Sequence, residues 1–237
     1  MSKSVFVTGG SGAIGSAIVR KMTEYGWRVA FCYNKNAQKA EALAVETGAR
    51  AYRANLEDPD SVNAMAETLE AEFGTPDALV NNAGKTSVMP FALLEAEDWD
   101  AAMSVNLKSM FLTTHALIRG MIRRRSGVIV NVSSIAGQRV LEVPVTYAAS
   151  KSGVAGFTLG LAREVARYGI RVNAIAPGML DDGVSANVPE QERNEYLRYC
   201  LAGRAGRCDE AADLVEFLCS DRASYINAQL IHLNGGL

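Results

Sequence analysis

The sequence is poor in the residues that build metal centres and disulfide frameworks. Its 237 residues include only two histidines, His115 and His232, and its four cysteines form no C-x-x-C pair. This spacing offers no pattern of metal ligands, and we expect free thiols in a cytoplasmic protein without a metal. A catalytic triad built on histidine is not expected either.

Strong net charge and long apolar runs are also missing. The formal net charge is -2 at pH 7, which predicts no attraction to nucleic acid or to an anionic membrane. No apolar run approaches the roughly 18 residues that cross a bilayer. The first strand pattern begins at Ser4, so we expect no signal peptide. With 49% hydrophobic residues, the chain can bury one large core.

A glycine-rich turn follows the first strand pattern. Residues 8–15 read TGGSGAIG and lead into a helical pattern. Glycines at such a turn let the backbone approach a pyrophosphate, which then sits at the positive end of the helix. The order of strand, turn and helix therefore predicts a dinucleotide-binding site.

Short apolar segments alternate with helical patterns along the rest of the chain. The expected strands are 5–7, 28–32, 49–54, 78–81, 128–132, 171–175 and 230–233. Between them we expect a helix start at Asp58-Pro59 and helix stops at Gly26 and Gly169. Apolar strands separated by helices predict a parallel sheet covered on both faces. We expect a single α/β domain over residues 1–237, a Rossmann-type doubly wound sheet of about seven strands. An irregular stretch at about 178–207 should cover the crevice at the strands' carboxyl ends.

Tyr147 and Lys151 stand four residues apart in a helical pattern, with Ser134 thirteen residues upstream of the tyrosine. Side chains at this spacing share a helix face. An ammonium group beside a phenol favours the phenolate, so we expect the pKa of Tyr147 to fall from about 10 towards neutrality. Such a phenol can exchange a proton with a substrate whose oxygen the serine holds.

With the Asn-Asn-Ala-Gly segment at 81–84, Asn106 and the Pro177-Gly178 pair, these residues resemble the short-chain dehydrogenase/reductase family. The motifs occur in the family's order and span residues 5–236. The resemblance implies a catalytic set of Asn106, Ser134, Tyr147 and Lys151. In it Ser134 polarises a carbonyl, Tyr147 donates a proton, Lys151 bonds the nicotinamide ribose and Asn106 holds a water. The implied cofactor contacts are Gly9, Ser11, Gly12, Ala13, Ile14, Gly15, Tyr33, Asn34, Lys35, Asn55, Leu56, Asn82, Ala83, Gly84, Tyr147, Lys151, Pro177, Gly178 and Leu180.

The end of the second strand bears on the choice of cofactor. A carboxylate there would bond the ribose 2′-hydroxyl of NAD and repel a 2′-phosphate. The run at 32–36, CYNKN, has none, and Asn34 and Lys35 suit a phosphate. Relatives that use NADP often carry Arg at the position of Gly12, and that charge is missing here. We expect NADP(H) in preference to NAD(H).

The chain is also similar to the 3-oxoacyl-acyl-carrier-protein reductases of that family, which implies an acyl-thioester substrate. An acidic carrier protein would need a basic surface, for which Arg123, Arg124 and Arg125 are candidates, with Arg167 and Arg171 in addition. A solvated helix end explains the three consecutive arginines equally well. The alternatives are a reductase of a free small ketone, a sugar or a polyketide intermediate, and a non-catalytic dinucleotide sensor.

Two long helical patterns, at 99–124 and 145–168, carry apolar residues on more than one face. The resemblance implies that they pair between subunits in a homodimer or homotetramer, although burial within one subunit would give the same pattern.

Overall fold

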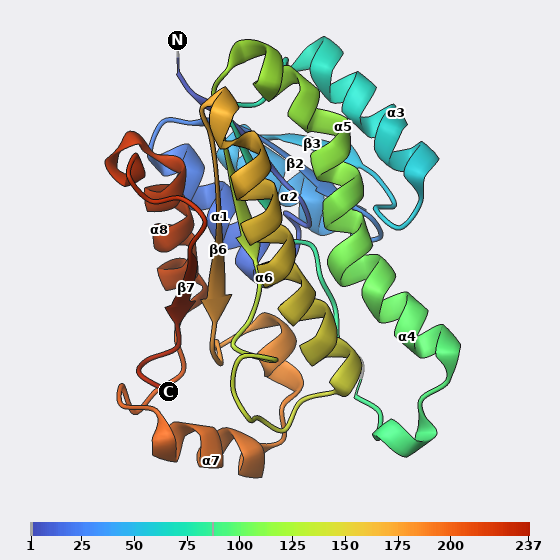
Figure 1. Cartoon of the computed structure of the whole chain (residues 1–237), viewed down its shortest axis with the longest axis vertical. Coiled ribbons are helices and arrows are strands. Elements are labelled where there is room, and N and C mark those ends of the chain that lie inside the picture. Colours follow the sequence, from blue (N-terminus) through green and yellow to red (C-terminus); the bar gives the residue numbers. More distant parts are fainter. Residues whose placement is uncertain (1, 87) are drawn as a thin grey trace.

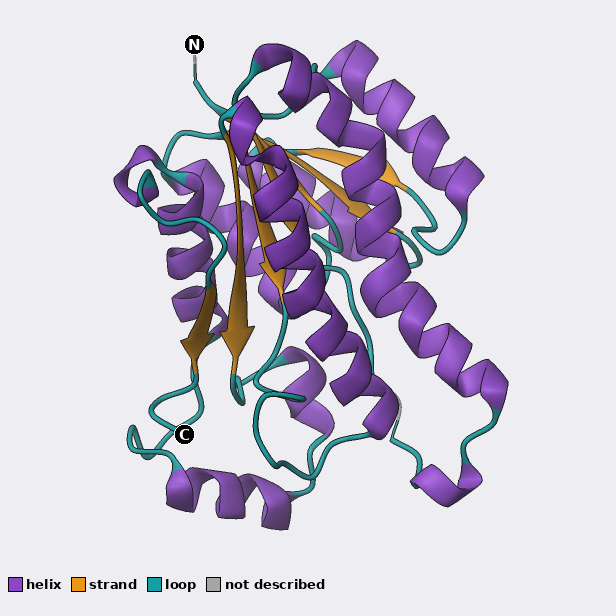
Figure 2. Ribbon diagram, viewed as in Figure 1, coloured by secondary structure: helices purple, strands orange, loops and turns teal. Residues whose placement is uncertain are grey.

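The computed structural model describes residues 2–86 and 88–237. Seven parallel strands form one sheet in the order β3-β2-β1-β4-β5-β6-β7. Helices cover both faces of this sheet (Figures 1 and 2). The order reverses between β1 and β4, which makes this pair the switch point of a doubly wound sheet. The fold class expected from the sequence is confirmed.

All seven expected strands are present, and their ends differ from the expected ends by at most two residues. The strands are β1 Ser4–Val7, β2 Arg28–Tyr33, β3 Arg50–Arg53, β4 Ala78–Asn81, β5 Gly127–Val132, β6 Ile170–Pro177 and β7 Leu230–Leu233. The largest difference is in β6, which continues to Pro177 and so carries its strand geometry up to the Pro177-Gly178 pair.

Each face of the sheet has its own apolar core. One core contains residues of α1 Ala13–Glu24, α2 Ala37–Thr47 and α8 Cys208–Cys219. The other contains residues of α3 Pro59–Glu72, α5 Ser109–Arg124 and α6 Val145–Val165. Val5 and Val7 belong to the first core and Phe6 to the second, because successive strand residues point to opposite faces.

Local signals fix several helix ends as expected. The Asp58 side chain accepts a hydrogen bond from Asp60 N at 3.1 Å, and Pro59 opens α3. Gly169 follows the 3₁₀ turn Ala166–Tyr168 with φ of 70°, a conformation that glycine adopts without strain.

The expected helix over 99–124 is present, but it is not α-helical throughout. The chain instead forms α4 Ala96–Met103, a π-helical turn Ser104–Lys108 and then α5. Asn106 lies within this turn and is buried. Single π-turns inside helices occur frequently at functional sites.

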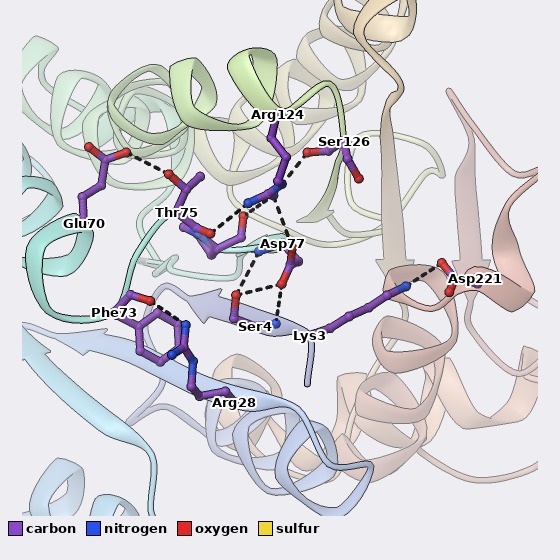
Figure 3. A network of polar contacts seen from close by, with 11 residues as sticks. Lys3, Ser4, Arg28, Glu70, Phe73, Thr75, Asp77, Arg124, Ser126 and Asp221 are labelled. Carbon is purple, nitrogen blue, oxygen red and sulfur yellow. Dashed lines mark hydrogen bonds and ion pairs between the residues drawn. The ribbon is translucent and has the colours of Figure 1, made fainter. Parts of the chain in front are cut away.

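A polar network joins segments at the amino-terminal ends of the strands (Figure 3). Ser4 donates from its backbone N and its Oγ to Asp77 Oδ2, at 2.7 and 2.9 Å. Arg124 donates to the carbonyls of Thr75 and Pro76, at 3.0 and 2.9 Å. Arg124 therefore ties the end of α5 to the segment that leads into β4, although the residue stays exposed.

Arg171 is fixed in a similar way. Its guanidinium donates to the carbonyls of Leu218, Ser220 and Ile226, between 2.9 and 3.2 Å. Because these bonds point the side chain into the fold, Arg171 does not add to a basic surface.

The stretch after β6 contains a 3₁₀ turn Gly183–Asn187 and the helix α7 Glu190–Tyr199. Figure 1 shows α7 lying beyond the arrowheads of β6 and β7. Two further 3₁₀ turns are Phe91–Leu93 and Asp221–Ala223. Within residues 2–86 and 88–237, none of the helices has the length and apolar character needed to cross a membrane.

Candidate functional site

A cavity of about 930 Å³ opens at the carboxyl ends of the strands. The expected site residues that line it are Gly9, Ser11, Gly12, Ala13, Ile14, Gly15, Asn82, Ala83, Gly84, Ser134, Tyr147, Lys151, Pro177, Gly178 and Leu180. The structure thus brings the glycine-rich turn, the segment after β4 and the Tyr147/Lys151 pair to one place.

The glycine-rich turn forms a tight cradle at the start of α1. Gly9 has φ of +67°, and a Cβ added to Gly15 would lie 2.1 Å from the Gly9 carbonyl oxygen. The turn therefore closes only with glycine at position 15. No side chain caps the amino end of α1 at Gly12, so this end suits the oxygens of a pyrophosphate.

Thr8 and Asn82 lock this turn to the end of β4. Thr8 Oγ1 accepts hydrogen bonds from the backbone N of Asn82 and of Ala83, at 2.9 and 3.1 Å. The Asn82 side-chain amide donates to the carbonyls of Thr8 and Gly9, at 2.9 and 3.2 Å. Thr8 was not among the expected contacts, although its place directly after β1 could have pointed to it.

Lys151 is held at both ends. Its Nζ donates to the Val132 carbonyl at 2.9 Å, and its own carbonyl accepts from Ser133 Oγ at 2.8 Å. Burial of the ammonium lowers the pKa of Lys151 to about 8. Ser133, which also lines the cavity, therefore anchors α6 to the end of β5.

Tyr147 differs from the sequence-based expectation. Lys151 Nζ lies 5.8 Å from the centroid of the tyrosine ring. Burial nevertheless raises the pKa of Tyr147, and hydrogen bonding with the Ser134 side chain opposes that rise only in part. The expected fall in this pKa is wrong for this structure, because a buried phenolate loses its hydration and the ammonium is bonded to a carbonyl instead.

Asn106 connects the π-turn to the segment after β4. Its Oδ1 accepts from Lys85 N at 2.9 Å, and its Nδ2 donates to Lys85 O at 3.0 Å and to Ser150 Oγ at 3.1 Å. A Cβ added to Gly84 would lie 3.1 Å from Asn106 Oδ1 and 3.3 Å from Lys151 Nζ. Asn106 thus lies close to Gly84, and its side-chain amide is hydrogen-bonded to other atoms of the protein.

The five expected contacts at the ends of β2 and β3 are Tyr33, Asn34, Lys35, Asn55 and Leu56, and they lie outside the cavity lining. Asn34 Nδ2 donates to Asn55 Oδ1 at 3.4 Å, so the two strand ends meet there. Asn34 and Lys35 are exposed. The Leu56 side chain is buried in the core that contains residues of α3.

One wall of the cavity combines the covering segment expected at about 178–207 with a loop that the sequence did not indicate. It is formed by the loop after β5 and by the segment around α7, through Arg139, Val140, Leu141, Glu142, Val143, Met179, Asp182, Val184, Val188, Glu192, Glu195, Tyr196 and Tyr199. These residues belong to no recognised pattern. Only the position of the segment after β6 indicated that some of them would face a cavity.

Arg123, Arg124 and Arg125 are all exposed at the end of α5. Arg123 Nη2 lies 4.0 Å from Glu70 Oε1, and both side chains are partly exposed. Arg125, with φ of 54°, donates to the Arg167 carbonyl at 2.7 Å and lies 5.9 Å from the Tyr168 ring centroid.

Comparison with known proteins gives consistent matches over nearly the whole chain. The family model described as enoyl-(acyl carrier protein) reductase matches residues 9–237. The 3-oxoacyl-[acyl-carrier-protein] reductase FabG of Staphylococcus aureus is 38% identical over 242 residues, covering 100% of this chain and 98% of the relative. Nodulation protein G of Rhizobium meliloti is 38% identical over 237 residues, covering 99% and 96%.

A solved structure also superposes closely. A crystal structure named as a ribose-5-phosphate isomerase from Brucella melitensis has a TM-score of 0.92 and 28% identity, and covers 99% of this chain and 92% of its own. The activity in its name differs from those in the names of the sequence relatives. The reaction must therefore be argued from the site and not from the fold.

Proposed function

Because this chain belongs to the short-chain dehydrogenase/reductase family, we propose that it is an NADPH-dependent reductase of 3-oxoacyl thioesters. Membership of this family makes the chain an oxidoreductase that acts between C=O and CH–OH groups with a nicotinamide cofactor. One observation carries the proposal: Ser134, Tyr147 and Lys151 line the same cavity as the glycine-rich turn.

The residues present fit a dinucleotide. The tight turn with glycine at positions 9 and 15 and the uncapped start of α1 suit its pyrophosphate. Lys151 would bond the nicotinamide ribose, and the ends of β2 and β3 would hold the adenosine part. When bound, the nicotinamide supplies the hydride chemistry, and the protein supplies orientation and the proton.

The proton is assigned to Tyr147. Its raised pKa keeps the phenol protonated near neutral pH, which is the form that can donate to the oxygen of a reduced carbonyl. Ser134 would hold that oxygen and polarise the carbonyl. Lys151, cationic below its pKa of about 8, would offset the negative charge that the tyrosine acquires after donating.

The preference for NADPH rests on the end of β2. No carboxylate follows Cys32 as far as Asn36, and the exposed Asn34 and Lys35 can meet a 2′-phosphate. Initial rates with NADPH and NADH test this directly. A lower kcat/KM with NADPH than with NADH would contradict the preference.

The substrate class rests on the relatives and on the exposed arginines at the end of α5. We expect turnover of an acetoacetyl group carried by an acyl carrier protein and of the small neutral N-acetylcysteamine thioester. Arg125→Glu should lower kcat/KM for the carrier-bound substrate and leave that for the neutral thioester unchanged. Lys39→Glu, an exposed charge reversal on α2, serves as the matched control.

The same panel decides between the alternatives. Turnover of small free ketones without turnover of any thioester would replace the acyl substrate with a free one. Tight NADPH binding without turnover of any carbonyl would instead support a dinucleotide sensor.

A further inference from the structure

The hydroxyl of Tyr196 joins three separate parts of the chain beside the cavity. The side chain comes from α7. Its Oη accepts a hydrogen bond from Met179 N at 3.1 Å, just after β6, and donates to the Asn234 carbonyl at 3.3 Å, just after β7. The phenol therefore bridges the ends of the last two strands of the sheet.

The backbone around this hydroxyl is shaped to admit it. A Cβ added to Gly178 would lie 2.2 Å from Tyr196 Oη and 3.0 Å from Asn234 Cα. Glycine at this position thus leaves the space that the hydroxyl fills. Partial burial also raises the pKa of Tyr196, so the phenol keeps the proton that it donates to Asn234.

Other contacts of the same segment point to the same docking place. Ala202 N donates to the Gly235 carbonyl at 2.9 Å. Cys200 Sγ, at the end of α7, lies 3.6 Å from the Asn234 carbonyl and 3.5 Å from that of Gly235. On the β6 side, Gly206 N donates to the Met179 carbonyl at 3.0 Å.

The position of Tyr196 connects this docking to the chemistry of the site. Tyr196, Met179 and Gly178 all line the cavity that contains Tyr147 and Lys151. A change in how α7 sits on the strand ends would therefore move the wall that faces a bound substrate, while Ser134 and α6 would stay in place.

We propose that Tyr196 is a positioning residue that seats α7 on the ends of β6 and β7 and so fixes the substrate wall of the cavity. This inference rests on the proposed reductase function, because its kinetic effect is defined for a carbonyl substrate. Its structural part, the seating of α7, does not depend on the reaction.

The test is Tyr196→Phe, which keeps the ring and removes only the hydroxyl. Loss of the bridge leaves the Met179 N–H without its partner, so KM for the neutral thioester should rise about five- to tenfold. The value of kcat should stay within about twofold, since the groups that react are unchanged. Tyr225→Phe, on a fully exposed tyrosine outside the cavity lining, is the matched control.

Hydrogen exchange of the same variants supplies the second readout. In Tyr196→Phe, amides of residues 178–207 should exchange faster while those of β1, β4 and β5 keep their rates. Unchanged exchange in α7 would overturn the seating, and an equal acceleration throughout the sheet would reassign Tyr196 to general stability. Because exchange needs no turnover, it decides the seating even if no carbonyl proves to be a substrate.

Discussion

At Tyr147 and Lys151, spacing in the sequence and burial in the fold act in opposite directions. The four-residue spacing correctly places the ammonium near the phenol ring, at 5.8 Å from its centroid. It does not reveal that both groups lose water, nor that Lys151 Nζ is bonded to the Val132 carbonyl. Burial is a property of the assembled fold, and it controls the direction of both pKa changes.

The pKa of Lys151 predicts how stability depends on pH. The folded value of about 8 lies below the ordinary 10.5. Between these values the unfolded chain binds a proton that the folded chain does not, so stability increases as pH rises. Relative to Lys151→Met, the free energy of unfolding should rise by about 3 kcal/mol between pH 7 and pH 10.5. Each unit of difference between the folded and unfolded pKa is worth about 1.4 kcal/mol.

Urea unfolding of both proteins across this pH range checks the prediction. The comparison removes the contributions of other titrating groups, such as Cys32 and Cys219, whose raised pKa values act in the opposite direction. A difference in unfolding free energy that does not vary with pH would show that Lys151 titrates as it does in water.

Among the elements, those with local signals were predicted and those that depend on distant contacts were not. The seven strands, the Asp58-Pro59 helix start and the Gly169 stop follow from short stretches of sequence. The π-turn at Asn106 does not, because Asn106 bonds the backbone of Lys85, 21 residues away in the sequence. The bridge made by Tyr196 escapes prediction for the same reason, since Asn234 is 38 residues away.

The glycine-rich turn gives a prediction about one element. Gly15→Ala would place a Cβ 2.1 Å from the Gly9 carbonyl, so α1 must move away from the turn. We expect a loss of more than about 2 kcal/mol in the free energy of unfolding, together with weaker NADPH binding. Thermal unfolding and cofactor fluorescence titration measure the two effects.

Gly12→Ala is the matched control in the same turn. Its Cβ would meet the Gly9 carbonyl at 3.4 Å, an ordinary contact, and its φ of -81° suits any residue. This variant should unfold close to the temperature of the parent protein. If both variants unfolded at the same temperature, close packing at Gly15 would not be what holds the turn.

For the whole molecule, exposed apolar side chains on α4, α5 and α6 predict self-association. Trp99, Phe111, Val145 and Leu159 are between 43% and 53% exposed, and α4 packs against α6. Apolar residues that extend beyond the core on neighbouring helices are typical of an interface between subunits. The sequence indicated this surface but not which of its residues would be exposed.

We therefore expect a homodimer or homotetramer, with Phe111 in a subunit interface. Phe111→Glu should shift the protein towards a smaller species in sedimentation velocity, because a charge buried at an apolar interface is costly. Val45→Glu is the control, because Val45 is 87% exposed and lies on α2, outside this group of helices. A parent protein that sediments as a monomer at micromolar concentration would contradict the expectation.

The central claim is that Tyr147 donates the proton in an NADPH-dependent carbonyl reduction. Single-turnover oxidation of NADPH by acetoacetyl-N-acetylcysteamine, compared between the parent protein and Tyr147→Phe, tests it most directly. We predict a loss in rate on the order of 10²–10⁴-fold for the variant, with NADPH affinity retained. A variant that reduces the thioester at the rate of the parent would contradict the account.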